Sequence, residues 1–223
     1  LTGTIKVSDR HIQLPRLGKL KLKEVGYLPL NAKILNATVS ERAGRWFVSI
    51  QVEEPDKQAS IKPQRHVGVD LGIKTLATLS NGEIFDNPKA LRKNLDKLQR
   101  LSRRLSRKIK GSKNRKKAAR KLAKLHFRIS NIRKDTLHKL TTFLTKTKSR
   151  VVIEDLNVSG MLKNRKLSRA IADLGLFEIR RQLEYKGKWY GCEIVIADRF
   201  FPSSKMCSHC GNIKNNLELS DRV

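Results

Sequence analysis

Apolar and polar residues alternate along several short stretches of the first 60 residues. An alternation with a period of two predicts strands that bury one face. Ile12 and Leu14 are among the expected inward residues, and a turn is expected at 43–44. The residues expected to share one face of the strand after this turn are Trp46, Val48, Ile50 and Val52. Several short strands joined by turns indicate a small β-barrel or sandwich.

A second alternating region follows a linker at 55–65, which contains two prolines and few apolar residues. Its pattern predicts strands at 66–71 and 74–79. Asn81-Gly82 then predicts a hairpin in which both turn residues adopt a positive φ, and the strand "EIFD" follows it. The region is therefore expected to be a three-stranded antiparallel meander with Asp70 on its first strand.

The apolar spacing changes to three, four and seven residues between 88 and 148, as in an amphipathic helix. Leu98, Leu105 and Ile109 belong to this stripe, which is interrupted at 110–114 and resumes up to Phe143. The pattern predicts a long helical hairpin with one narrow apolar stripe.

The remaining elements alternate between strand and helix. A buried strand that ends in acids is expected within 150–158, an amphipathic helix at 167–191, and another buried strand at 192–200. Gly191 is expected to close the helix, and Cys192 to be an inert core residue. The order of three strands, helices, strand, helix and strand predicts an α/β RNase H-like fold.

The charge distribution adds a partner to this picture. The formal net charge is +29, and residues 89–148 hold 23 Lys or Arg against two acids. A run of charge is usually a solvated face, but here acids are too few to relieve the repulsion, and a phosphate backbone would relieve it. The expected nucleic-acid-binding residues of the hairpin are Arg103, Arg104, Arg107, Lys116, Lys117 and Arg120.

The sequence gives little support to a membrane role. It contains no run of 18 apolar residues, no visible signal peptide and no basic amphipathic helix rich in Trp and Phe. We therefore expect a cytoplasmic protein without a membrane partner. Because the chain begins with Leu1 rather than Met, we also expect it to be a fragment of a longer protein.

Two acids at strand ends are the candidate catalytic residues. Asp70 lies near the end of the strand "HVGVDL" and Glu154 at the end of "VVIE". In an RNase H-like fold these strands are neighbours, so the two carboxylates would repel each other unless a divalent cation lay between them. Mg²⁺ prefers such oxygen ligands, and two ions can clamp both oxygens of a phosphodiester displacement. The structural alternative is an Asp70 that caps the turn at Gly72.

Three further features are weaker candidates. Asp155 should point to the opposite face of its strand from Glu154 and cap the next turn, whereas Asp198 could approach the site from the edge of the sheet. Cys207 and Cys210 form one C-x-x-C knuckle, which supplies two of the four ligands of a Zn²⁺ ribbon. His209 is expected to face solvent, and a redox-active cysteine pair is the alternative.

Several motifs together resemble the TnpB family of transposon-encoded nucleases, which are relatives of type V CRISPR effectors. The motifs are "LPRLGKLKL", "ERAGRWFVSIQVE", "GVDLGIKTLATLSNG", "VVIEDLNVSGML" and "KWYGCEIVIADRFFPSSKMCSHCG", together with the basic hairpin. The resemblance implies an RNA-guided DNA endonuclease of a transposable element, with a guide RNA and a target DNA as partners. It also implies a two-metal RuvC mechanism with Asp70 and Glu154 as the first two catalytic acids.

The resemblance further implies three parts. Residues 1–60 correspond to part of a wedge β-barrel that grips guide RNA, 61–200 to a RuvC domain with the hairpin 88–148 inserted, and 201–223 to the start of a zinc ribbon. The third acid of the family follows a second C-x-x-C, and this sequence ends before either. We therefore expect that the 223 residues alone lack one Mg²⁺ ligand and half of the zinc ligands.

Three other functions remain open on the sequence. The first is an RNA-guided DNA-binding repressor without nuclease activity, which would be marked by loss of the acids. The second is a transposase that acts by strand transfer. The third is a binding module for RNA or DNA without sequence preference.

Overall fold

The computed structural model describes residues 4–26, 32–53, 65–199, 206, 210, 212 and 213. The chain divides into two compact units, each built from two segments. The first unit comprises residues 1–58 and 90–134, and the second comprises 59–89 and 135–223. Each unit has its own hydrophobic core.

Two small sheets make up the β part of the first unit. Strands β1 (Lys6–Ser8), β2 (His11–Leu14) and β3 (Gly18–Lys21) form an antiparallel sheet, and β4 (Lys33–Arg42) and β5 (Arg45–Glu53) form a long hairpin. The core between the sheets is centred on Ile12, Leu14 and Ala37, with Val48 and Ile50 packed against it. The predicted inward residues Ile12 and Leu14 are confirmed, since each is only 1% exposed.

The tip of the β4–β5 hairpin lies against helix α2 of the same unit. The turn falls at Ala43 and Gly44, as predicted, and both have a positive φ. The rings of Phe47 and Phe127 are 5.7 Å apart, and the guanidinium of Arg45 lies 5.8 Å from the Phe127 ring. Trp46 is 74% exposed because it is the second residue of β5 and lies beside the turn.

Helices α1 (Ala90–Ser106) and α2 (Lys113–Thr147) form the predicted hairpin. Their contact is built from Ala90, Leu125 and Ile129, with other apolar residues of the stripe around them. Ile109 is an exception. It belongs to the predicted stripe but is 81% exposed, because α1 ends before it and the residue lies in the turn.

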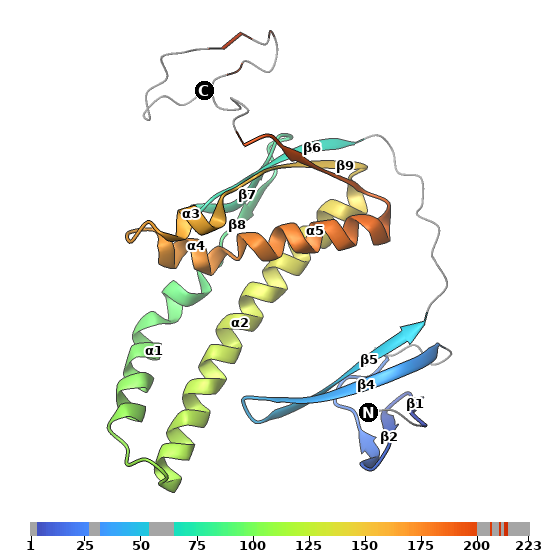
Figure 1. The fold of residues 1–223 in the computed structure, drawn as a ribbon, viewed down its shortest axis with the longest axis vertical. Coiled ribbons are helices and arrows are strands. Elements are labelled where there is room, and N and C mark those ends of the chain that lie inside the picture. Colours follow the sequence, from blue (N-terminus) through green and yellow to red (C-terminus); the bar gives the residue numbers. More distant parts are fainter. Residues whose placement is uncertain are drawn as a thin grey trace. The chain divides into compact units, whose positions relative to one another are not determined.

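A five-stranded mixed sheet organises the second unit (Figure 1). Its strands are β6 (His66–Leu71), β7 (Thr75–Leu79), β8 (Ile84–Asp86), β9 (Arg150–Glu154) and β10 (Glu193–Ala197). Their order is β10-β9-β6-β7-β8; β6, β7 and β8 form an antiparallel meander, while β9 and β10 run parallel to β6. The predicted α/β architecture and order of elements are therefore observed.

The turn between β7 and β8 differs from the prediction. Only Gly82 has a positive φ, whereas Asn81 does not. Gly82 N–H donates to Leu79 O, and Leu79 N–H donates to Glu83 O, so the loop has three residues. A three-residue loop needs a left-handed residue only at its last position, which explains why Asn81 keeps a negative φ.

Helices cover one face of this sheet. The covering helices are α4 (Ser168–Leu174), α5 (Leu176–Tyr190) and the C-terminal end of α2 (Figure 1). The short helix α3 (Val158–Leu162) follows β9 in the chain. The helix predicted over 167–191 is thus two helices, since Gly175 has a φ of 72° and ends the first. Gly191 ends α5, as predicted, with a φ of 63°. The buried residues of this core include Val67, Val69, Leu140, Leu144, Val151, Ile153, Ile179 and Leu183.

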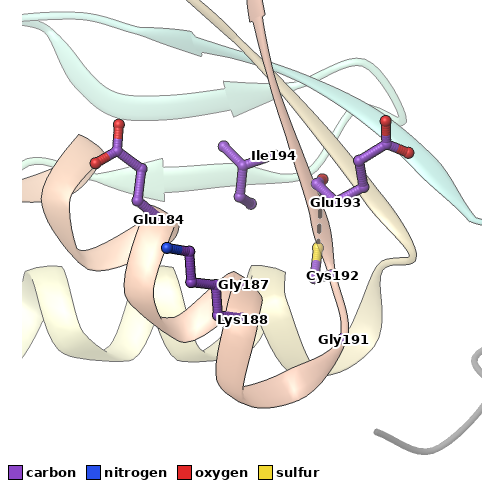
Figure 2. Close-up of a pocket in the computed structure, with 7 residues that line it drawn as sticks. All are labelled: Glu184, Gly187, Lys188, Gly191, Cys192, Glu193 and Ile194. Atoms are coloured by element: carbon purple, nitrogen blue, oxygen red, sulfur yellow. Dashed lines mark hydrogen bonds between the residues drawn. The ribbon is translucent and has the colours of Figure 1, made fainter.

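Helix α5 comes very close to strand β10 at Gly187 (Figure 2). A Cβ at this position would lie 2.7 Å from Cys192 O and 2.8 Å from Ile194 Cγ1. Cys192 itself is 5% exposed, which confirms the prediction of a core residue, and its Sγ lies 3.8 Å from Glu193 O. The absence of a side chain at 187 is therefore what allows the helix to pack on the strand.

A buried polar network joins α5 to α2 within the same core. Lys186 Nζ donates to the hydroxyls of Thr141 and Thr142, each at 2.8 Å, and to His138 O at 3.1 Å. The Thr141 hydroxyl lies 2.9 Å from Oε1 of Gln182, whose amide in turn donates to Glu178. Burial lowers the pKa of Lys186. Because every buried polar group here has a partner, the network fixes how the two helices are aligned.

We expect Gly187→Ala to lower the free energy of unfolding by about 1–3 kcal/mol or more, because α5 and β10 must move apart. Gly68→Ala is the matched control. Its Cβ would meet Ser80 only at 3.8 Å, an ordinary contact, so its stability should stay within about 0.5 kcal/mol of the parent. Urea unfolding of both variants measures the difference, and equal stabilities would contradict the close contact.

Glu178 should make stability depend on pH in the acid range. Its hydrogen bond from Arg181 is the main cause that lowers its pKa from 4.5 to about 2. A carboxyl group whose folded pKa is lowered stabilises the fold fully above pH 4.5, and this contribution is lost as the pH falls toward 2. Glu178→Gln should therefore weaken the fold at pH 7 but scarcely at pH 2. Urea titrations at several pH values test this, with Glu184→Gln on the same helix as the control.

Candidate functional site

The register of β6 and β9 brings Asp70 and Glu154 together. The last pair in register is Val69 with Ile153, and Asp70 and Glu154 are the next residues on the two strands. Successive side chains of a strand point to opposite faces. Val69 and Ile153 are buried under the helices, so Asp70 and Glu154 point to the other face, where both are exposed.

The neighbours of the two acids on this face are short side chains. Ala197 of β10 is in register with Glu154, and Thr78 of β7 is in register with Asp70. Within the second unit, α4, α5 and the end of α2 pack against the opposite face of the sheet. The two carboxylates therefore lie on an open surface that a large substrate can approach.

Asp70 does not act as a cap for the following turn. Gly72 N–H donates to Leu76 O, not to the carboxylate of Asp70. Within the described part of the chain, the carboxylate of Asp70 makes no hydrogen bond or ion pair. The structural alternative for this acid is thus not supported.

The role predicted for Asp155 is wrong. Instead of capping the next turn, it accepts hydrogen bonds from Nη1 of Arg180 at 3.0 Å and Nη2 of Arg199 at 2.5 Å. Asn157 caps α3 in its place, by accepting from Gly160 N–H. Asp155 is two-thirds buried, and two fixed guanidinium groups compensate its charge better than a turn N–H would.

Asp198 follows the last residue of β10. Ala197, and not Asp198, occupies the position beside Glu154 in the sheet. Asp198 lies beyond the paired part of β10, so its approach to the site stays a prediction.

The donor set fits a hard divalent cation. Carboxylate oxygens are the ligands that Mg²⁺ prefers, and it keeps several waters as further ligands. Asp70 and Glu154 supply these oxygens from adjacent strands, and a cation would offset their mutual repulsion. The described residues contain no group of three or more acids, histidines or cysteines that could hold a metal.

A pocket of about 330 Å³ adjoins Glu154 at the end of β9, within the second unit. Phe177, Arg180 and Arg199 form part of its wall. No local pattern predicts this pocket, because α5 and the end of β10 are distant in the chain from β9.

The six predicted nucleic-acid-binding residues of the hairpin are all exposed on α1, α2 and the turn between them. Arg104 and Lys117 line a pocket of about 420 Å³ between the helices, together with Lys108 and Lys121. No acid lines this pocket. The turn is held by Arg115, whose Nη1 donates to Leu105 O and Lys108 O. The hairpin thus offers clustered cations on a rigid support, as phosphate binding requires.

One of the two predicted zinc ligands lies outside the described residues. Cys207 and His209 are outside the described residues, and Cys210 is an exposed free cysteine. The zinc knuckle therefore stays a prediction. None of the described helices is long and apolar enough to cross a membrane.

Comparison with known proteins gives two family matches. Residues 49–165, just over half of the chain, match the OrfB_IS605 family, described as "Probable transposase". Residues 177–223 match the "Cas12f1-like, TNB domain" family. The first match spans the meander, the hairpin and β9, and so contains both Asp70 and Glu154.

Two curated relatives carry the name "Putative RNA-guided DNA endonuclease", the second with the suffix InsQ. The chain is 50% identical to the one from Streptomyces pristinaespiralis over 87% of its length and 48% of the relative's. It is 38% identical to the one from Escherichia coli K12 over 95% of its length and 56% of the relative's. The chain thus spans about half the length of these relatives.

A solved Cas12f1–sgRNA–target DNA complex has 21% identity and a TM-score of 0.49, over 76% of this chain and 36% of that one. The family matches and the relatives confirm the resemblance drawn from the sequence motifs. The chain belongs to the OrfB_IS605 family of probable transposases, whose members include the TnpB proteins.

Proposed function

We propose that this chain is part of an RNA-guided DNA endonuclease that hydrolyses DNA phosphodiesters. The observation that carries the proposal is the placement of Asp70 and Glu154 side by side on the open face of the sheet. The strand order β10-β9-β6-β7-β8 supports an RNase H-like, RuvC-type nuclease domain. The names of the relatives from Streptomyces pristinaespiralis and Escherichia coli supply the guided DNA substrate.

The two acids would hold the catalytic metal. Divalent cations such as Mg²⁺, two of them in the mechanism that we propose, would supply the Lewis acidity for attack on the phosphodiester. Asp70 and Glu154 come from neighbouring parallel strands whose backbones are hydrogen-bonded, so their positions are fixed before substrate binds. The helices behind the sheet make this support rigid.

The basic hairpin would hold the nucleic acids. Arg103, Arg104, Arg107, Lys116, Lys117 and Arg120 would contact phosphates of the guide RNA or of the target DNA. In this proposal residues 1–60 form part of a wedge-like β-barrel, 61–200 the nuclease domain with the hairpin 88–148, and 201–223 the start of a zinc ribbon. Cys207 and Cys210 would be two of its Zn²⁺ ligands.

Two alternatives make different products. A repressor derived from the same family would bind guided DNA and leave it intact, but both visible acids are present here. A strand-transfer transposase would join the cut end to a second DNA. Product analysis distinguishes the three, because only a nuclease releases free 5′ and 3′ ends.

Asp70→Ala and Glu154→Ala should each lower the rate of guided DNA cleavage by about 10²–10³ or more, because each removes a metal ligand. Binding of guide and target should persist. Glu193→Ala is the matched control, since it removes an exposed carboxylate from the adjacent strand β10. Single-turnover cleavage and a binding assay measure the two effects. A normal rate for Asp70→Ala would remove this acid from the site.

The hairpin should set the salt dependence of RNA binding. Each phosphate neutralised contributes about 0.7–0.9 to the slope of log K against log salt. Reversing four charges to Glu should therefore lower the slope by about 3, at Arg103, Arg107, Lys116 and Arg120. Reversing four exposed charges of the second unit is the control for net charge, at Lys163, Arg165, Lys166 and Arg169. Equal slopes for the two variants would assign the effect to net charge alone.

A further inference from the structure

We propose that the pocket beside Glu154 is a base subsite, which binds the nucleobase of an unpaired nucleotide next to the phosphodiester that is cut. This inference rests on the proposed nuclease function, because it takes Glu154 as a residue of the reaction site. It assigns a role to Phe177, Arg180, Arg199 and Asn157.

The location of the pocket determines what can enter it. Glu154 is one of its lining residues, so a group bound there lies next to one of the two acids. The beginning of α5 and the loop into α3 supply other lining residues, among them Phe177 and Asn157. A volume of about 330 Å³ is at the lower end for small-ligand sites. It suits part of one nucleotide rather than a paired stretch of duplex.

The wall of the pocket offers an aromatic ring to its occupant. Phe177 is 71% exposed, although Leu176 and Ile179 of the same helix are buried in the core. Its neighbour Leu176 is only 4% exposed and belongs to the core, so the backbone that carries the ring is fixed. In a nucleic acid the flat apolar groups are the bases, and exposed aromatic rings bind unpaired bases by stacking.

The polar groups of the pocket are held in place by Asp155. Its carboxylate binds Arg180 and Arg199, and its carbonyl accepts a second hydrogen bond from Arg199 at 3.2 Å. Arg180 also donates to Glu184 at 3.0 Å. The two guanidinium groups are therefore largely neutralised, and they act as oriented donors rather than as a source of long-range attraction.

Asn157 gives the pocket a group that can read a base edge. Its Oδ1 accepts from Gly160 N–H and from the Ser159 hydroxyl, which fixes the side-chain amide. Its Nδ2 has no acceptor among the described residues. A pocket that contains both a fixed amide donor and an aromatic ring is suited to a base with an acceptor on its edge.

The experiment uses the full protein with its guide RNA and a DNA target that carries one abasic nucleotide, scanned across the cleavage position. An abasic nucleotide at the flanking position should slow wild-type cleavage about tenfold, the scale of one stacked base. Phe177→Ala should slow cleavage of normal DNA by a similar factor. The two changes together should cost no more than either alone, because both remove the same contact.

Two variants control for structure. Trp189→Ala removes another exposed aromatic residue of α5, 64% exposed and outside the pocket, and should respond to the abasic nucleotide like the wild type. Phe177→Tyr keeps the ring and should retain activity. The effect of Phe177→Ala should also persist at raised salt, whereas effects of hairpin charges should change with salt.

A binding measurement separates this inference from the proposed function. In Asp70→Asn protein, a 2-aminopurine at the flanking position should be quenched on binding, and Phe177→Ala should abolish the quenching. If wild type does not cleave but quenching occurs, the nuclease function fails and the base subsite stands. If wild type cleaves and the abasic and Phe177→Ala effects multiply, or quenching is unaffected, the base subsite is wrong. A pocket filled by another segment of the chain would give this last result.

Discussion

The alternation of side chains along β6 and β9 is the constraint on which the rest of the second unit depends. One face of these strands must be apolar because it packs against the helices, and this leaves the other face free for polar residues. Val69 and Ile153 fix the first face, and the next residue of each strand carries a carboxylate on the second. A slip of the register by one residue would bury an acid and expose a valine. The packing of the core and the placement of the acids are therefore one requirement.

The helix packing behind the sheet that carries Asp70 and Glu154 contains buried polar residues. Lys186, Gln182 and Thr141 are almost fully buried between α5 and α2, and they bind one another rather than water. Such a network tolerates few alternative alignments, since any shift would leave a buried polar group without a partner. At the other end of α5, Asp155 binds Arg180 and so connects the helix to the residue after Glu154. Both contacts restrain the helix against the sheet that carries the acids.

The positive charge of the chain is concentrated on the helical hairpin, away in sequence from the two acids. The hairpin carries its cations on a narrow apolar seam, and almost no acids offset them. Its own packing therefore works against electrostatic repulsion, which a bound polyanion would remove. The open face of the sheet, by contrast, holds two acids and short neutral side chains. In the proposed function, attraction of nucleic acid and the chemistry on it therefore belong to separate groups of residues.

The sequence by itself determined the strands, the hairpin helices, the places of Asp70 and Glu154 near strand ends, and the basic surface. The catalytic role of the two acids stays a proposal. The spacing of apolar residues and the distribution of charge are local properties of the chain, so they can be recognised before the fold is known. It did not determine the break at Gly175 or the turn at Asn81, because both depend on backbone angles that neighbouring elements impose. It also misassigned Asp155, whose partners Arg180 and Arg199 are 25 and 44 residues away along the chain. Only the tertiary structure decided which distant side chains meet, and it alone brought Phe177 and Glu154 to one pocket, because a pocket is made by elements that the sequence separates.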